Sequence, residues 1–372
     1  MRVSPGCGAM KLLPLPDATR RSTSSVLESA SPSREEDTRR RTVPVAFIAG
    51  VGRSGTTLLD RLLGSTPKLH SGGELGAVWN HGLVEDRLCS CGARFSCCPF
   101  WQAVGTNSFS SLRADEIDTV VRYTHSVFRT QKMWRILFGR SRRSLVNSAP
   151  SAFFETTERL YQRVLDVSAR QVVVDSSKLP MYLVLLEHIP SVDLHVVHLV
   201  RDPRAVAHSW LRPLVSDPDG RTSMPRFGAA KSAVLWLITN AAVEWIAWWL
   251  EVPYVRVRYE DLVKDPAWIV RQLRSEILRA TEYGDQEVRN TNNEDIDLDI
   301  VHSISGNPMR FRQGRMSIVE DVEWQTGPRS RKAIVAAITF PLRWRYGYRG
   351  SPGFSQGRPV SVRPDAPPGR SR

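Results

Sequence analysis

Residues 43–63 read VPVAFIAGVGRSGTTLLDRLL, and this stretch decides the fold. Within it, Val45–Ala49 is a short apolar run with β-branched residues, and it stops at Gly50. From Thr57 onward, leucines recur with helical spacing. The stretch therefore predicts a strand, a glycine loop and a helix. Such a loop turns successive backbone N–H groups toward one point at the positive end of the helix, where an anion is stabilised.

The residue types in the loop indicate what kind of anion it binds. The glycines have Walker A spacing up to Gly55, but Thr56 and Thr57 stand where that motif has Lys followed by Ser or Thr. The lysine that reaches a nucleoside triphosphate is therefore missing. A different cation, Arg53, lies inside the loop, and Ser54 adds a hydroxyl donor.

This loop resembles the 5′-phosphosulfate loop of the sulfotransferase family, which uses 3′-phosphoadenosine 5′-phosphosulfate (PAPS). The resemblance implies an α/β fold with a central parallel sheet flanked by helices and a P-loop-like phosphate-binding strand, loop and helix. It also implies that five loop residues bind the 5′-phosphosulfate: Arg53, Ser54, Gly55, Thr56 and Thr57. Leu58 departs from the pattern, because cytosolic members usually have an adenine-stacking tryptophan there.

A second phosphate motif follows about 150 residues later. Leu194–Val200 has the composition of a strand, and Arg201 closes it. Asp202-Pro203 is a good helix start, which puts Ser209 about two turns along that helix. In the sulfotransferase family, an arginine and a serine with this spacing bind the 3′-phosphate. The resemblance gives this role to Arg201 and Ser209.

A third segment, residues 302–314, resembles the family's C-terminal loop that closes over the 3′-phosphate. Arg312 and Gly314 match that loop, whereas Gln313 replaces its lysine. The resemblance therefore adds Arg312 and Gly314 to the residues expected to bind the nucleotide.

Two further residues are candidates for the chemistry. Residues 71–75, Ser-Gly-Gly-Glu-Leu, predict a turn that presents the carboxylate of Glu74, and the catalytic base proposed for tyrosylprotein sulfotransferases has a similar place. Residues 171–175 predict a strand followed by Lys178, at a sheet edge that faces ligands. The resemblance implies that Glu74 accepts the acceptor's proton, while Lys178 and Arg53 neutralise charge on the bridging oxygen. His302 is the alternative base, and this scheme requires no metal.

Four cysteines lie within ten residues: Cys89, Cys91, Cys97 and Cys98. Four thiolates could bind Zn²⁺, although Cys-x-Cys and Cys-Cys differ from the usual Cys-x₂₋₄-Cys pairs. We expect a structural knuckle, either metal-bound or reduced, rather than a catalytic site.

The chain of 372 residues, 41% of them hydrophobic, is long enough for a substantial α/β core. We expect a disordered leader over residues 1–42, a sulfotransferase domain over 43–348 with a helical acceptor-side insertion at about 105–168, and a disordered tail over 349–372. No signal-peptide core is evident, and the apolar stretch Ala233–Leu250 contains Asn240 and Glu244. We therefore expect a cytoplasmic protein without a membrane-spanning helix.

The formal net charge of +13 suits anionic ligands. Nucleic-acid binding is not expected, because no helix-turn-helix, zinc-finger or RNA-binding signature accompanies the charge. Peripheral contact with an anionic membrane stays open. The expected function is transfer of the sulfuryl group of PAPS to a hydroxyl of a small molecule, carbohydrate or lipid. The alternative is a P-loop kinase or NTPase, against which the absent Walker lysine counts. The acceptor and the oligomeric state do not follow from the sequence.

Overall fold

The computed structural model describes most of the central part of the chain. The described residues are 41–109, 112–127, 141–214, 218, 224–279, 296–349 and 360–362. The expected leader therefore lies outside the described residues except for its last two positions. The same is true of most of the expected tail.

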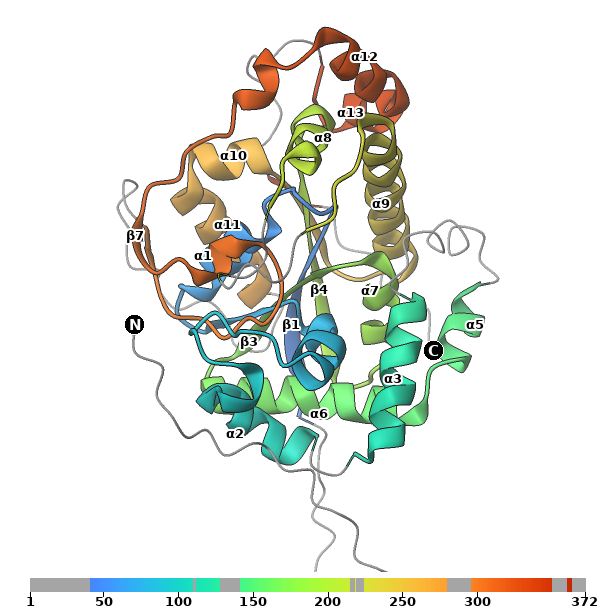
Figure 1. Ribbon diagram of the computed structural model, residues 1–372, viewed down its shortest axis with the longest axis vertical. Coiled ribbons are helices and arrows are strands. Elements are labelled where there is room, and N and C mark those ends of the chain that lie inside the picture. The colour runs from blue at the N-terminus through green and yellow to red at the C-terminus, as the bar shows by residue number, and fades with distance from the viewer. Residues whose placement is uncertain are drawn as a thin grey trace, which may run out of the picture.

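A six-stranded sheet forms the centre of the protein (Figure 1). Its order is β2-β3-β1-β4-β5-β8, and the first five strands are parallel. In that order the strands are Leu69–Gly73, Val172–Lys178, Val43–Ala49, Val192–Val200, Tyr254–Arg258 and Val360–Val362. A separate two-stranded sheet pairs β6 (Ile296–Leu298) with β7 (Gly314–Met316). The predicted α/β fold with a central parallel sheet is confirmed.

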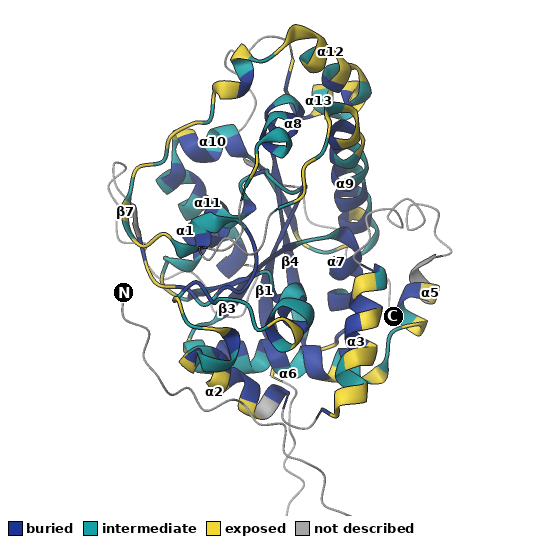
Figure 2. Cartoon of the chain, viewed as in Figure 1, coloured by how far each residue is buried: buried dark blue, intermediate teal, exposed yellow. Residues whose placement is uncertain are grey.

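Helices cover both faces of the sheet, because side chains of a strand point alternately to either side. In β1, Val45 and Phe47 belong to one apolar cluster, whereas Ala46 and Ile48 belong to another. Helices α6, α7 and α9 pack against the first face, and α1, α10 and α11 against the second (Figure 1). These helices are Ser151–Ser168, Pro180–Glu187, Ala229–Trp249, Thr56–Gly64, Tyr259–Lys264 and Pro266–Arg279, respectively. Figure 2 shows the sheet and the inner sides of these helices as buried.

Shorter elements complete the structure around this core. The remaining helices are α2 (Pro99–Ser108), α3 (Ala114–Val127), α5 (Ser141–Asn147), α8 (Pro203–Leu211), α12 (Arg329–Ile338) and α13 (Phe340–Arg345). Short 3₁₀ helices are η1 (Leu75–Ala77), η3 (Phe95–Cys97), η5 (Pro308–Phe311) and η6 (Glu323–Thr326), and η2 (Val78–Val84) is a π-helix. The end of α2 and helices α3, α5 and α6 lie in the described part of residues 105–168.

Two local expectations need correction. Ser71–Gly73 is not a turn but the end of β2, an edge strand that pairs with β3, so that Glu74 follows a strand directly. Val360–Val362 lies in the tail expected to be disordered, yet it pairs antiparallel with β5. In both cases the strand is short and gains its hydrogen bonds from a longer neighbour, which a local pattern does not reveal.

The longest apolar helix, α9, carries buried polar groups that are paired. The side-chain oxygen of Asn240 lies 2.9 Å from His198 Nε2, and Glu244 accepts a 2.8 Å hydrogen bond from Arg256. Within the described residues, no helix has the length and apolar character needed to cross a membrane.

Candidate functional site

A cavity of about 460 Å³ lies at the carboxyl ends of the parallel strands. Its wall includes the loop after β1, Lys178 at the end of β3, Arg201 after β4 and Tyr259 after β5. In open α/β sheets this edge is where ligands bind, next to the point where the strand order reverses. Residues that are about 200 positions apart in the sequence therefore meet at one cavity because of the sheet topology.

The loop between β1 and α1 depends on two glycines. Gly50 has a φ of 150°, and a Cβ there would lie 2.5 Å from the carbonyl oxygen of Leu199. Gly55 has a φ of 94°, and a Cβ there would lie 2.5 Å from the ring of Tyr259. No side chain caps the start of α1, so the N–H groups of its first turn have no side-chain acceptor among the described residues. Thr56 and Thr57 at this helix end line the cavity.

Arg53 brings a positive charge to the same loop. Its φ of 72° is unusual for a residue other than glycine. Its guanidinium group lies 5.0 Å from the ring centre of Trp210, and its three nitrogens are buried without a hydrogen-bond partner among the described residues. Burial and then the nearby charge of Arg212 lower the pKa of Arg53 below its usual value. A bound anion would offset both the burial of the Arg53 charge and its repulsion from Arg212, so the loop fits a phosphate or sulfate group.

Arg201 and Ser209 lie on the wall of this cavity beside the loop. Arg201 donates a 3.2 Å hydrogen bond to the carbonyl of Arg53 and another of 3.2 Å to Asp321. Its guanidinium group also stacks on Tyr259, 4.3 Å from the ring centre. Asp321 accepts a second hydrogen bond, of 2.5 Å, from Arg212. These cations make the cavity suited to an anionic ligand with more than one charged group.

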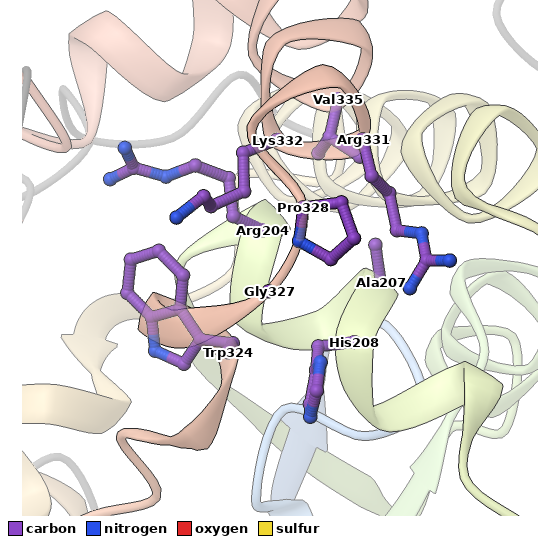
Figure 3. Close-up of a pocket in the computed structure, with 9 residues that line it drawn as sticks. All are labelled: Arg204, Ala207, His208, Trp324, Gly327, Pro328, Arg331, Lys332 and Val335. Atoms are coloured by element: carbon purple, nitrogen blue, oxygen red, sulfur yellow. The ribbon is translucent and has the colours of Figure 1, made fainter.

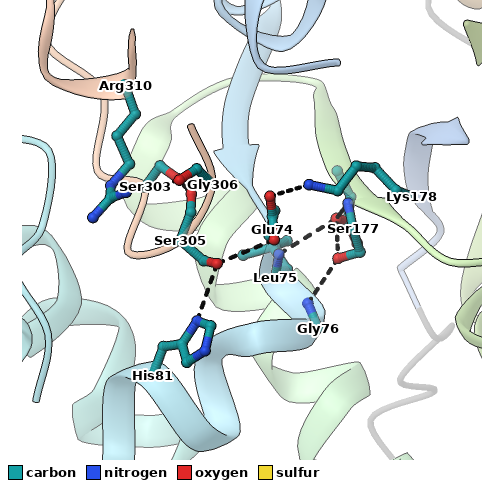
Figure 4. A network of polar contacts seen from close by, with 11 residues as sticks. Glu74, Leu75, Gly76, His81, Ser177, Lys178, Ser303, Ser305, Gly306 and Arg310 are labelled. Atoms are coloured by element: carbon teal, nitrogen blue, oxygen red, sulfur yellow. Dashed lines mark hydrogen bonds and ion pairs between the residues drawn. The ribbon is translucent and has the colours of Figure 1, made fainter. Parts of the chain in front are cut away.

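Glu74 and Lys178 form an ion pair at one end of the cavity (Figure 4). Lys178 has a φ of 70°, a strained backbone conformation of the kind often found at functional sites. The hydroxyl of Ser305 donates a 3.1 Å hydrogen bond to the other carboxylate oxygen of Glu74 and lies 3.0 Å from His81 Nδ1. Both carboxylate oxygens are therefore held in place.

A second cavity, of about 170 Å³, lies on the other side of this ion pair. Glu74 lines the second cavity, Lys178 lines the first, and Leu179 lines both. Most of the other side chains around the second cavity carry hydrogen-bonding groups: Asn80, His81, Thr124, His125 and Ser177. The carboxylate and the ammonium group thus stand between a cationic cavity and a polar one.

Asp175, which the sequence analysis passed over, supports this boundary. It is buried in the middle of β3 and accepts hydrogen bonds from the backbone N–H and the hydroxyl of Ser177, at 2.8 and 2.6 Å, and from Tyr161. The Ser177 hydroxyl in turn accepts a 2.9 Å bond from the N–H of Gly76 (Figure 4). Burial raises the pKa of Asp175 to about 6. These bonds tie the strand end that carries Lys178 to the turn that follows Glu74.

Several expected site residues lie elsewhere. Ser54, within the loop, is buried and is not part of the cavity wall. The cavity wall also excludes Arg312, which is exposed, and Gly314, which begins β7. The reason is η5, which turns the chain so that Arg310 is buried and donates to the carbonyl of Gly306, while Arg312 points outward.

His302 and the cysteines also differ from expectation. His302 lies with Cys89, Cys91 and Cys98, whereas Cys97 is outside this cluster. His302 is on the wall of neither cavity, so the alternative assignment of His302 as the base is not supported. A sequence pattern could not show this, because the histidine is more than 200 residues away from the cysteines.

Four site residues were not singled out from the sequence: Trp210, Arg212, Tyr259 and Asp321 line the first cavity. Tyr259 follows a strand, which is the one available signal, whereas the others lie on a helix end or in loops. A further basic pocket, between Arg204, Trp324 and Lys332, measures about 10 Å³ (Figure 3). That volume accommodates about one water molecule and excludes a nucleotide.

Fold and site together define an α/β protein with a cationic cavity at the carboxyl edge of a parallel sheet, where a carboxylate and a lysine meet a second, polar cavity. Residues 44–277 match the family model described as the Sulfotransferase family. This match spans more than half of the chain, and the protein belongs to that family.

Individual relatives are more distant. Human carbohydrate sulfotransferase 2 is 34% identical over 23% of this chain and 22% of its own length. The match thus spans about a fifth of that curated relative. The sulfotransferase domain from the Synechococcus PCC 7002 olefin synthase has 16% identity, a TM-score of 0.41 and coverage of 83% of this chain and 97% of that domain. The sulfotransferase domain from the curacin biosynthetic pathway has 18% identity, a TM-score of 0.39 and coverage of 81% and 98%.

Proposed function

We propose that the protein transfers the sulfuryl group of PAPS to a hydroxyl acceptor. The observation that carries the proposal is the Glu74–Lys178 ion pair between the cationic cavity and the polar one. Sulfotransferase family membership supports the reaction class, and the unpartnered guanidinium nitrogens of Arg53 support an anionic donor. The volume of the first cavity is in the range that small-molecule and cofactor sites have.

In this proposal the first cavity holds the nucleotide. The N–H groups at the start of α1, the hydroxyls of Thr56 and Thr57, and Arg53 would bind the 5′-phosphosulfate. Arg201 and Ser209 would bind the 3′-phosphate. The guanidinium group of an arginine can form two parallel hydrogen bonds to a phosphate. PAPS supplies an activated sulfuryl group when it is bound.

Glu74 would act as the general base. It would accept the proton of the acceptor hydroxyl while that oxygen bonds to sulfur and the bond from sulfur to the bridging phosphate oxygen breaks. Lys178 and Arg53 would neutralise the charge that develops on the bridging oxygen. The products are a sulfate ester and 3′-phosphoadenosine 5′-phosphate (PAP), and the proton released by the acceptor is on Glu74.

The second cavity would hold the reacting end of the acceptor. Its side chains can donate and accept hydrogen bonds, which suits a polar acceptor such as a carbohydrate better than an aliphatic lipid. The similarity to a carbohydrate sulfotransferase supports the same class. A panel of carbohydrate, lipid and small phenolic acceptors, incubated with PAPS and analysed by mass spectrometry, would identify the class.

Glu74→Gln tests the chemistry, because it keeps the shape of the side chain and removes its basicity. We expect the rate of sulfate transfer to fall by roughly 10²- to 10⁴-fold. The affinity for PAP, measured by calorimetry, should stay unchanged. Glu155→Gln is the matched control, since Glu155 is exposed on α6 and lines neither cavity. Near-normal turnover of Glu74→Gln with a fast acceptor would show that another group is the base.

The kinase or NTPase alternative makes a different prediction. Such a protein would be stabilised against heat by ATP with Mg²⁺, whereas a PAPS-dependent enzyme would be stabilised by PAP. Thermal-shift measurements with both ligands distinguish the two functions.

A further inference from the structure

Three cysteines and a histidine converge next to the site, although they come from distant parts of the chain. Cys89 and Cys91 lie in the loop that precedes η3, Cys98 immediately precedes α2, and His302 follows β6. Their sulfur atoms and a ring nitrogen all lie within 4.8 Å of one another. The helix that Cys98 precedes and the segment of His302 are therefore joined at one point.

Three of the six distances between these atoms are close to those in a tetrahedral metal site. Cys91 Sγ lies 3.7 Å from Cys98 Sγ, and His302 Nδ1 lies 3.7 Å from Cys89 Sγ and 3.2 Å from Cys98 Sγ. Zinc bonds of about 2.3 Å to sulfur and about 2.0–2.1 Å to nitrogen place tetrahedral ligands about 3.8 Å apart for two sulfurs and about 3.5 Å apart for sulfur and nitrogen. The three measured separations differ from these values by a few tenths of an ångström.

The neighbours hold the four side chains in this arrangement. The N–H of Cys89 donates a 2.7 Å hydrogen bond to the carbonyl of Ala93, and the carbonyl of Cys89 accepts a 2.8 Å hydrogen bond from the N–H of Gly92. The imidazole of His302 stacks on Phe100 with ring centres 4.8 Å apart and an interplanar angle of 5°. Trp101 Nε1 donates a 2.7 Å hydrogen bond to the carbonyl of His302. Bracing of the ligands by outer groups is typical of metal sites.

Ser90, between the two cysteines of the loop, binds the backbone on both sides of His302. Its hydroxyl donates to the carbonyl of Val301 at 2.6 Å and accepts from the N–H of Ser303 at 2.9 Å. Its own N–H donates to the carbonyl of Ser303 at 2.9 Å. The histidine is thus fixed relative to the cysteines by backbone contacts, independently of its ring.

We propose that Cys89, Cys91, Cys98 and His302 bind one Zn²⁺ ion. Thiolate and imidazole ligands together favour zinc, and four protein ligands leave no open position, which is typical of a structural site. An ordinary reduced core does not account for an imidazole nitrogen in contact with two sulfurs and close to a third, and a disulfide would use only two of the four groups.

The metal site lies close in sequence to residues that contact Glu74. Ser303, next to His302, donates a 2.8 Å hydrogen bond to the carbonyl of Ser305, whose hydroxyl binds Glu74 (Figure 4). Zinc would therefore hold the segment that orients Glu74. This consequence rests on the proposed function, whereas the metal site itself does not.

The primary test is the zinc content of the full chain, purified without an affinity tag and without added metal. Elemental analysis should find about one zinc per chain. Cys91→Ser and Cys98→Ser should lose it, and Ala103→Ser, at an exposed position of the helix that Cys98 precedes, should keep it. His302→Ala should lose zinc, and His302→Cys should retain it because a thiolate replaces the imidazole.

Wild-type protein provides a second measurement if these variants fail to fold. Exchange of the metal for Co²⁺ should produce the intense visible absorption of tetrahedral cobalt with thiolate ligands, and chelation should lower the melting temperature. Protein that contains no zinc and has reduced thiols would overturn the proposal, as would a Cys91–Cys98 disulfide found by mass spectrometry. Retention of zinc by both Cys91→Ser and Cys98→Ser would overturn the ligand set. None of these readouts depends on sulfate transfer.

Discussion

At the scale of single residues, Arg201 connects the parts of the first cavity. It contacts the carbonyl of Arg53, the carboxylate of Asp321 and the ring of Tyr259. An arginine held from three sides loses little further conformational entropy when it binds a phosphate. We therefore expect Arg201 to contribute strongly to selectivity between nucleotides.

Arg201→Ala should remove most of the preference for PAP over AMP, because AMP lacks the 3′-phosphate. Loss of a charged hydrogen-bonding partner costs about 2–3 kcal/mol, or roughly 30- to 150-fold in affinity. Calorimetry with both nucleotides measures the ratio. Arg312→Ala is the control, since Arg312 is exposed and outside the cavity wall, and it should leave the preference intact. Equal affinity of the wild-type protein for PAP and AMP would contradict the assignment.

At the scale of elements, α3 forms part of the wall of the second cavity. Thr124 and His125 from this helix line the cavity opposite the turn that follows Glu74. His125 is exposed, so a larger side chain there fits without displacing the core. The helix thus offers a way to change the acceptor side alone.

His125→Trp should narrow the second cavity and raise the KM for the acceptor by roughly tenfold, the equivalent of about 1.4 kcal/mol of steric cost. The affinity for PAP should stay the same, because α3 contributes no residue to the wall of the first cavity. Arg122→Trp places the same side chain on an exposed position of α3 that lines neither cavity, and its kinetics should match the wild type. An unchanged acceptor KM in His125→Trp would exclude this cavity as the acceptor site.

The elements differ in how well a sequence predicts them. Strands β1, β3, β4 and β5 are long enough to contain apolar runs that can be recognised in the sequence. Strand β2, with two glycines and a histidine in five residues, and β8, with three residues, form because a neighbouring strand supplies their hydrogen bonds. The same reason limits site prediction. Residues at strand ends, such as Arg201 and Lys178, follow from topology, whereas His302 and Asp321 reach their partners through loops whose path no local pattern encodes.

At the scale of the whole molecule, buried carboxylates affect stability. Asp60 on α1 is buried and accepts a 2.5 Å hydrogen bond from Ser71 of β2. Burial raises the pKa of Asp60 to about 7, from a usual value of 3.8. The folded protein therefore binds more protons than the unfolded chain between about pH 4 and pH 7. This difference lowers the free energy of unfolding as the pH rises through that window.

Asp60→Asn should remove part of this pH dependence. The contribution of Asp60 is at most about 1.4 kcal/mol per pH unit, so the variant should gain stability relative to the wild type as the pH increases from 4 to 7. Urea unfolding at several pH values measures the difference. Asp118→Asn, on the exposed face of α3, is the control and should give a curve parallel to the wild type. Parallel curves for Asp60→Asn would show that Asp60 titrates normally in the folded state.

The central place of β1 in the sheet has a consequence for motion. β1 is hydrogen-bonded to β3 on one edge and to β4 on the other, and all seven of its residues are buried. Its amide protons can therefore exchange with solvent only when the sheet itself opens, whereas peripheral helices such as α3 can open locally at lower cost. The cationic cavity thus lies at the end of β1, whose amide protons we expect to exchange most slowly. One wall of the polar cavity is formed by α3, whose amide protons we expect to exchange early. The donor would bind to a surface that is already formed, whereas peripheral helices such as α3 would adapt to different acceptors.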